Sequence, residues 1–340
     1  MSTDLNIEEP AALLAYLRAR DRIESEEEPV MRALHGGVSN RTVLVERASG
    51  EAWVLKQALA KLRVPVDWFS SPERVHREAE GLRWLQRLAL PRSIPDLIFE
   101  DREEHLLAMQ AVPLPHDNWK TLLLDGQVEL DLVDQFSLQL ATIHGNAYRR
   151  RSEVAPAFAD RSFFESLRLE PYYGYTAEQL PAARAFLTQL MADCRQRTLT
   201  LVHGDYSPKN ILVHNGRLIL LDHEVIHWGD PAFDVGFSMT HFLSKAHHLP
   251  ARRDAFAAAG LRYWDGYLQQ VAGEPWADEL EAHSVRHTMG CLLARVAGRS
   301  PLEYLDDQER ATQRAAVVAL VSEPPTTMKQ LIDGFLAGLS

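Results

Sequence analysis

Between residues 205 and 224 the sequence places side chains that could hold a divalent cation. Asp205, Asn210, Asp222 and Glu224 bring three carboxylates and one amide into a single short stretch. Their oxygens are hard ligands, and a cluster with three negative charges suits Mg²⁺ better than zinc. Because three unpaired buried carboxylates would be costly, we expect a cation to accompany them.

The same stretch predicts a β-hairpin that brings its two ends together. Asn215-Gly216 separates two short apolar runs, which is a strong signal for a type I′ turn. The resulting register places Asn210 opposite Leu221, so the loop before the first strand and Asp222 after the second lie at the same end. Strict alternation would put the side chains of Asn210 and Asp222 on opposite faces, so the pattern predicts proximity of the two backbones only.

The segment that begins at His203 has the pattern of a kinase catalytic loop. Asp205 and Asn210 have the D-x-x-x-x-N spacing of that loop, and Asp222 stands where kinases place their metal-binding Asp. The segment resembles the catalytic loop of the aminoglycoside phosphotransferase and choline kinase superfamily, in which His-Gly-Asp replaces His-Arg-Asp. The Asp-His-Glu motif that begins at Asp222 is similar to the DxE motif of methylthioribose kinases.

This resemblance implies an ATP- and Mg²⁺-dependent kinase that phosphorylates a hydroxyl group of a small molecule of the aminoglycoside, sugar or amino alcohol class. Asp205 would be the catalytic residue, which accepts or orients the proton of the acceptor hydroxyl. The metal ligands would be Asn210, Asp222 and Glu224. One alternative is a non-catalytic nucleotide-binding module of the same fold. Another is a metallohydrolase that needs no nucleotide, built from His203, Asp205, Asp222 and His223.

A lysine after one strand and a glutamate on the next helix form a second pair of candidates. Lys56 follows the predicted strand 53–55, and Glu78 lies within the apolar stripe of a helix predicted to begin at Ser71. A carboxylate in an apolar stripe requires a charge partner, so we expect Lys56 to pair with Glu78, as the strand lysine and helix glutamate of kinases do. The open alternative is a weak i,i+4 surface pair between Arg74 and Glu78.

Two further segments are expected to contact the nucleotide. Residues 35–40 lie shortly before Lys56 and would be the turn that covers the phosphates, although they lack the three-glycine pattern of protein kinases. Residues 109–112 resemble the hinge that receives adenine through backbone hydrogen bonds. The resemblance therefore assigns the following residues to the nucleotide: Gly36, Gly37, Ser39, Asn40, Lys56, Glu78, Gln110 and Val112.

Other histidines and aspartates around the loop are expected to have structural roles. His203 would hold the loop by hydrogen bonds, and Asp234 would tie it to the next helix. His214, His223 and His227 are expected to be surface residues at turns and strand ends, and not a zinc site.

The acceptor pocket has one candidate segment. A capping box with proline at N1 predicts a helix start at Ser300. Arg295 and Arg299 precede it and could meet an anionic group of the acceptor. The expected partner is a small-molecule hydroxyl acceptor.

The length, the composition and the distribution of strand and helix patterns along the chain predict the architecture. The 340 residues are 46% hydrophobic and 24% charged, as in globular proteins, and 36 basic against 47 acidic residues give a net charge of −11, which argues against nucleic acid as a partner. We expect no membrane partner and a cytoplasmic location, since no apolar run approaches ~18 residues. The chain is rich in strands up to a proline-rich segment near residue 112 and mostly helical after it. We therefore expect an α+β, bilobal protein-kinase-like fold, with a small β-rich nucleotide-binding N-lobe at 1–112 and a larger helical catalytic and acceptor-binding C-lobe at 113–340.

Overall fold

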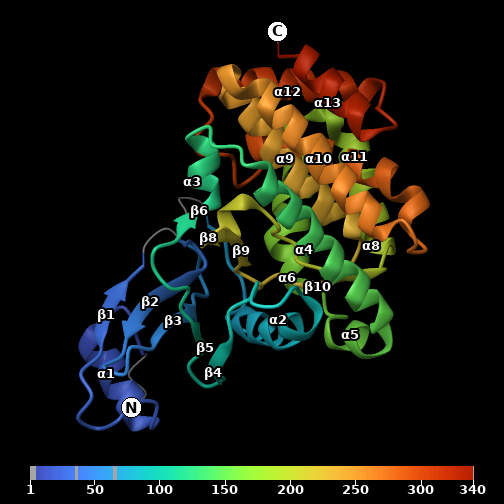
Figure 1. Cartoon of the computed structure of the whole chain (residues 1–340). Helices are drawn as coiled ribbons and strands as arrows, with labels where there is room; N and C mark the ends of the chain where they lie inside the picture. Colours follow the sequence, from blue (N-terminus) through green and yellow to red (C-terminus); the bar gives the residue numbers. More distant parts are fainter. Residues whose placement is uncertain (1–4, 35–36, 64–66, 340) are drawn as a thin grey trace.

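The N-terminal region is built around one antiparallel sheet. The computed structural model describes residues 5–34, 37–63 and 67–339. Five strands pair in the order β1-β2-β3-β5-β4, and helix α1 precedes them (Figure 1). Their bounds are α1 Pro10–Ala19, β1 Val30–Ala33, β2 Asn40–Glu46, β3 Ala52–Ala58, β4 Leu97–Asp101 and β5 Leu106–Gln110.

Helix α2, Arg74–Leu88, joins the sheet to the rest of the chain. It contacts β3, β4 and β5 on one side and α4 on the other. Val75, Leu82 and Leu85 are buried on the face that also carries Glu78, as the apolar stripe predicts. The regular helix begins at Arg74, later than predicted, because Ser71 Oγ accepts the N–H of Glu73 at 3.3 Å in a preceding turn.

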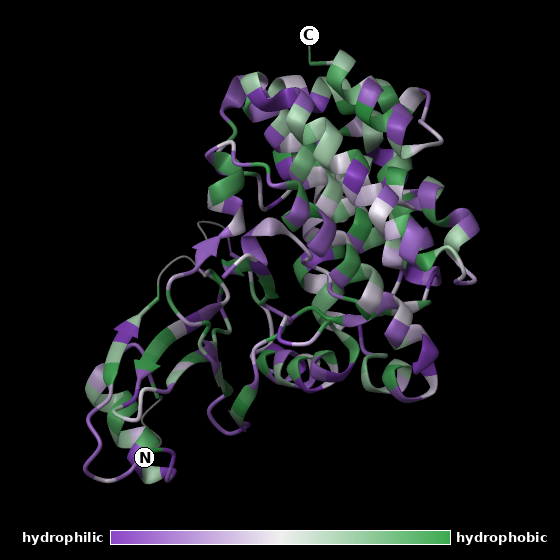
Figure 2. Ribbon diagram, viewed as in Figure 1, coloured by the Kyte–Doolittle hydropathy of each residue, from purple (hydrophilic) through white to green (hydrophobic). Residues whose placement is uncertain are grey.

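The remainder is mostly helical, and the predicted fold class is confirmed. Helix α9, Pro231–His248, is buried from Pro231 to His247 and contacts α10, α11, α12 and α13 (Figure 1). Figure 2 shows apolar residues along these central helices. Among the described residues, no helix is long and apolar enough to cross a membrane. The other helices are α3 Trp119–Leu124, α4 Leu130–Arg149, α5 Arg151–Ala157, α6 Ser162–Phe164, π-helix η1 Glu165–Gly174, α7 Tyr175–Gln179, α8 Arg184–Gln196, α10 Arg253–Val271, α11 Ala277–Ala297, α12 Asp307–Ser322 and α13 Met328–Ala337, with short 3-10 turns at Pro181–Ala183, Pro208–Asn210 (η3) and Pro250–Arg252.

Short strands interrupt this helical region, and the predicted hairpin is among them. β8, Ile211–His214, pairs with β9, Arg217–Leu220, in the predicted register, and the Leu221 N–H donates to the Asn210 carbonyl at 2.9 Å. β6, Asp117–Asn118, adds to β8, while β7, Thr200–Val202, pairs with β10, His227–Gly229. The hairpin therefore places the loop before β8 beside the loop after β9.

The prediction that a helix starts at Ser300 is wrong. Residues 298–306 form bends and loop, and α12 begins at Asp307 behind a capping box made by Asp306 and Glu309. Ser300 does not cap a helix, since its hydroxyl and carbonyl both accept hydrogen bonds from Arg295 Nη1, at 3.1 and 2.6 Å.

Candidate active site

The loop after β7 holds Asp205 in one place. The backbone N–H groups of His203 and Gly204 donate to the two carboxylate oxygens of Asp234, at 2.7 and 2.8 Å, and His144 Nε2 contacts the same carboxylate at 3.2 Å. Burial raises the pKa of Asp234, but the hydrogen bond from His144 and the other partners outweigh it, so the pKa lies below its usual value. The predicted role of Asp234 in tying the loop to α9 is confirmed.

Gly204 meets a steric requirement of this loop. Its φ is +78°, a conformation that favours glycine, and a Cβ there would lie 3.0 Å from Val225 Cγ2 and 3.1 Å from the Val225 carbonyl oxygen. A larger residue there would strain the backbone and push against Val225.

His203 is structural, as expected. Its Nδ1 accepts the N–H of Asp205 at 3.2 Å, which leaves the proton on Nε2, and Nε2 faces His223 Nδ1 at 3.1 Å. Burial lowers the pKa of both rings, so both are neutral. Because Asp205 and His223 engage the two nitrogens of His203, the metallohydrolase alternative loses one of its ligands.

Asp205 carries its two side-chain contacts on one oxygen. Asn210 Nδ2 donates to Oδ2 at 2.8 Å, and Arg168 Nη2 lies 2.7 Å from the same oxygen. Arg168 comes from the π-helix η1, and its Nε also donates to the Gly204 carbonyl. Burial lowers the pKa of Arg168, but Asp205 and the other nearby acids raise it above its usual value. The contacts leave Oδ1 of Asp205 to receive a proton, and they leave the Asn210 amide oxygen to face a cation.

Lys56 lies between two carboxylates. Its Nζ is 2.7 Å from Glu78 Oε1 and 2.9 Å from Asp222 Oδ1, so the predicted pair of Lys56 with Glu78 is confirmed. Burial lowers the pKa of Lys56, yet Asp222 and Glu78 raise it overall, and burial raises the pKa of Glu78 to about 7 against the influence of Lys56. For Asp222, burial is outweighed by Lys56 and Lys209, which hold its pKa below the usual value. The three residues form one charged group that links β3, α2 and the hairpin.

Asp222 reaches this group through an unusual backbone conformation. Its φ is +69°, in the left-handed region that non-glycine residues rarely adopt. The turn ends the strand alternation that would have placed Asp222 and Asn210 on opposite faces. Strain of this kind is concentrated at functional sites.

Glu224 is engaged by two side chains that the sequence did not connect with it. Arg74 Nε lies 3.1 Å from Glu224 Oε2, and Asn40 Nδ2 donates to the same oxygen at 3.3 Å. The buried Arg74 also donates to four backbone carbonyls, one of them that of Ser39. The alternative pair of Arg74 with Glu78 is therefore wrong, because Arg74 lies inside the fold and faces Glu224.

The donor set fits a hard cation. Asp222 offers Oδ2, Glu224 offers Oε1 and Asn210 offers its amide oxygen, because the contacts described above engage the other atom of each group. Carboxylate and amide oxygens are the donors that Mg²⁺ takes in proteins. Asp222 is the least buried of the three, with 23% of its side chain exposed, which gives a cation access.

A cavity of about 1090 Å³ lies beside Lys56. It is lined by Lys56 and by apolar side chains from both regions of the chain, including Val54 of β3 and Leu212 of β8. The predicted hinge forms one wall with Gln110 and Val112. The N–H of Gln110 donates to the Asp96 carbonyl and that of Ala111 to the Ala52 carbonyl, so among the described hinge residues the Val112 N–H is left for a ligand.

The predicted phosphate-covering turn is only partly described. His35 and Gly36 lie outside the described residues, and Gly37 is exposed. Ser39 is half-buried, while Asn40 is buried at the start of β2 and points to Glu224. The structure thus brings Asn40 to Glu224.

His214, His223 and His227 each have separate contacts in the structure. His214 Nδ1 contacts the Pro115 carbonyl, and His227 Nδ1 contacts the Val225 carbonyl. His223 and His227 are fully buried, which contradicts the expectation that they are surface residues. Both pack inside the fold, His223 against His203 and His227 against Phe164.

Three buried basic side chains form a group that we call the cation cluster: Lys245, Arg295 and His241, the last of which is neutral because burial and the two neighbouring cations lower its pKa well below the usual value. The Lys245 Nζ donates to the His241 carbonyl at 3.4 Å and, among the described residues, makes no ion pair. Burial, and to a smaller extent Lys120, lower the pKa of Lys245 to about 7. Arg295 Nη1 donates to Tyr172 Oη at 2.9 Å.

Arg168, Arg74 and Lys245 were not identified from the sequence. Arg168 lies in a π-helical segment, and the spacing of its apolar residues did not predict this segment. Arg74 had a usable signal, since it is four residues before Glu78 and shares its buried stripe. Lys245 had a usable signal, since it is the one lysine or arginine in a helix whose other residues are mostly apolar or uncharged.

Comparison with known proteins supplies independent findings. The profile described as phosphotransferase enzyme family matches residues 30–280. The methylthioribose kinase of Yersinia pseudotuberculosis serotype O:3 (strain YPIII) is 25% identical over 325 residues, covering 78% of this chain and 78% of that protein.

Solved structures with similar folds include a kinase and a phosphotransferase. The amicoumacin kinase hAmiN, in complex with AMP-PNP, Ca²⁺ and Ami, superposes with a TM-score of 0.59 at 13% identity, covering 89% of this chain and 91% of that chain. The macrolide 2'-phosphotransferase MphH from Brachybacterium faecium gives a TM-score of 0.53 at 19% identity, covering 92% of this chain and 98% of that chain. At these identities the likeness establishes the shared fold.

Proposed function

The chain belongs to the phosphotransferase enzyme family and is a small-molecule phosphotransferase, and we propose that it transfers the γ-phosphate of ATP to a hydroxyl group in a Mg²⁺-dependent reaction. The observation that carries the proposal is the arrangement of Asp205. Its Oδ2 is held by Asn210 and Arg168, beside the group formed by Lys56, Glu78 and Asp222.

In the proposed reaction Asp205 accepts the proton of the acceptor hydroxyl at Oδ1. Arg168 fixes the orientation of the carboxylate through Oδ2, so the proton-accepting oxygen faces one direction only. Positioning of this kind and neutralisation of charge supply most of the catalysis in phosphoryl transfer.

Other residues would hold the nucleotide. Lys56, oriented by Glu78, would contact the α- and β-phosphates, and Asp222 and Asn210, with Glu224 as a further ligand, would hold Mg²⁺. When bound, Mg²⁺ would neutralise phosphate charge. Adenine would enter the cavity beside the Gln110 carbonyl and the Val112 N–H, and we place the boundary between the two lobes in this hinge, between residues 112 and 113.

The resemblance implied an acceptor of the aminoglycoside, sugar or amino alcohol class, and within the wider range of hydroxyl compounds we favour one that carries an anionic group. In the cation cluster, Arg295 Nε and His241 Nε2 are buried without hydrogen-bond partners among the described residues, and the Lys245 ammonium is buried without an ion pair. Buried polar groups normally have partners, and a carboxylate or phosphate would satisfy all three. A polycationic aminoglycoside would be repelled there.

The cation cluster is connected to Asp205 through side chains. Arg168, which contacts Asp205, lies over the Tyr172 ring at 5.9 Å, and Arg295 lies at 5.7 Å from the same ring and donates to its hydroxyl. An acceptor whose hydroxyl reaches Asp205 could therefore place an anionic group near Arg295.

A coupled ADP-release screen tests both the proposed kinase activity and the proposed anionic acceptor. It would compare hydroxy acids, homoserine and sugar phosphates with methylthioribose, choline and aminoglycosides, each with MgATP. Turnover of an anionic acceptor is the expected result. Turnover of neutral or cationic acceptors alone would refute the acceptor class and leave the kinase proposal standing. Nucleotide binding without turnover of any acceptor would favour the non-catalytic module.

A further inference from the structure

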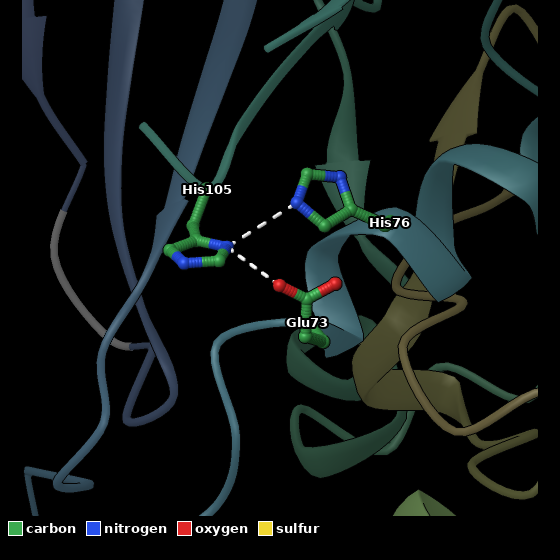
Figure 3. Close-up of side chains that lie close together, drawn as sticks. All are labelled: Glu73, His76 and His105. Carbon is green, nitrogen blue, oxygen red and sulfur yellow. Dashed lines mark hydrogen bonds and ion pairs between the residues drawn. The ribbon is translucent and has the colours of Figure 1, made fainter. Parts of the chain in front are cut away.

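Three metal-ligating side chains converge away from the catalytic loop. Glu73 and His76 lie at the start of α2, and His105 lies in the turn between β4 and β5. Figure 3 shows the two imidazoles and the carboxylate turned toward one another. One ligand atom from each lies within 4.8 Å of the others, so a single ion could contact all three.

The distances match a tetrahedral zinc centre. Zinc bonds of about 2.0–2.1 Å at tetrahedral angles place neighbouring ligand atoms roughly 3.3–3.4 Å apart. His76 Nε2 lies 3.3 Å from His105 Nδ1, and His105 Nδ1 lies 3.4 Å from Glu73 Oε1. Two edges of the tetrahedron are therefore already formed.

Glu100 orients the His76 ring in a way that suits metal binding. Its Nδ1 contacts Glu100 Oε1 at 2.7 Å, which fixes the proton on Nδ1 and turns the lone pair of Nε2 toward His105. A carboxylate on the far nitrogen of a ligating histidine is the usual outer partner at zinc sites. Glu100 is itself paired with Arg83 and Arg102.

The backbone of His105 supports the same reading. Its φ is +47°, a left-handed conformation that is uncommon outside glycine and that occurs at sites under functional constraint. His105 and Glu73 are partly exposed, at 36% and 56% of their side chains, so an ion has access and a water could complete the coordination.

We propose that Glu73, His76 and His105 form a zinc site that fastens the start of α2 to the β4–β5 turn. Two imidazole nitrogens and one carboxylate suit Zn²⁺ and disfavour Mg²⁺, which prefers oxygen ligands only. The site is separate from the proposed Mg²⁺ ligands and does not depend on the proposed function. Its effect would be to anchor the helix that carries Glu78.

The test is titration of chelator-treated full-length protein with ZnCl₂, followed by calorimetry in excess Mg²⁺ so that the oxygen ligands of the active site are occupied. We expect one Zn²⁺ per chain in this background and, with Co²⁺ in its place, the visible absorption of a tetrahedral centre. His105→Ala should weaken zinc binding by at least about 100-fold, and Glu100→Gln by about 10- to 100-fold.

Matched variants decide the outcome. Glu103→Gln alters another carboxylate of the same turn, and His248→Ala removes a histidine that lies 2.8 Å from a carboxylate elsewhere in the fold, that of Glu309; both variants should bind zinc as the unaltered protein does. Circular dichroism of the metal-free variants shows whether they fold. Zinc binding that persists unchanged in folded His105→Ala, or a Co²⁺ spectrum without tetrahedral character, would overturn the proposal.

Discussion

Replacing Lys56 separates its structural role from its proposed catalytic one. Lys56→Met leaves Glu78, which is 0% exposed, without the ammonium 2.7 Å away, and it also removes the partner of Asp222. Breaking a buried pair on one side costs about 3–5 kcal/mol, because the remaining charge is buried without compensation. The double variant Lys56→Met/Glu78→Leu removes both charges, and such apolar replacements are often neutral or stabilising. We therefore expect the double variant to recover most of the lost free energy of unfolding while lacking turnover.

The assay is urea unfolding at neutral pH, with nucleotide titration of the same proteins. Lys329→Met is the matched control, because Lys329 and Asp333 form an exposed pair at 2.6 Å that should contribute about 0–1 kcal/mol. A loss in Lys56→Met no larger than in the control would refute the reasoning. So would a double variant that stays as unstable as Lys56→Met.

The pH dependence of Lys56→Met follows from Glu78. Lys56 lowers the pKa of Glu78, which burial has raised to about 7, so the substitution raises that pKa further. A carboxyl with a raised pKa in the folded state retains its proton more strongly there than in the unfolded chain, so stability falls as pH rises. The loss in Lys56→Met should therefore be larger at about pH 8 than at about pH 6. An equal loss at both values would contradict this assignment.

Three further outcomes are expected. Asp222→Ala should lose most of the Mg²⁺-dependent stabilisation by MgATP, which reaches about 2.7 kcal/mol at a hundredfold excess over Kd; an unchanged shift in melting temperature would remove Asp222 from the metal site. Asp234→Asn should cost about 1–3 kcal/mol in urea unfolding, because one of two backbone N–H groups loses its acceptor, and the stability that Asp234 supplies at neutral pH should be lost as pH falls below its unfolded pKa. Arg295→Gln should raise the KM of an anionic acceptor at least about tenfold with nucleotide affinity unchanged, whereas exposed Arg299→Gln should not; equal KM values would exclude Arg295 from the acceptor site.

The sequence predicted the features that local rules determine. The Asn215-Gly216 turn specified the hairpin register, because a two-residue loop of this type favours a type I′ turn, which fixes how the two strands pair. The pairing of Lys56 with Glu78 followed from a carboxylate in an apolar stripe. Each of these rests on spacing within one element or on the cost of a buried charge.

Features that depend on long-range packing could not be predicted. Arg168 contacts Asp205 from a π-helix, which has no characteristic periodicity in the sequence. Arg74, which contacts Glu224, lies on a helix that is far from Glu224 in the chain. The positive φ of Asp222 could not be predicted either, because Asp adopts that conformation more readily than most residues but does so at only a small fraction of its positions. The helix cap predicted at Ser300 was wrong. The Ser300 hydroxyl instead accepts a hydrogen bond from Arg295, at the end of the preceding helix.

The most direct test of the proposed reaction is the turnover of Asp205→Asn beside its nucleotide affinity. The substitution keeps the size of the side chain and removes the charge that draws the proton of the acceptor hydroxyl. ADP release with the acceptor found in the screen should fall about 10²- to 10⁴-fold, while MgATP binding should change little. Turnover within about threefold of the unaltered protein would contradict the role of Asp205 as the catalytic base.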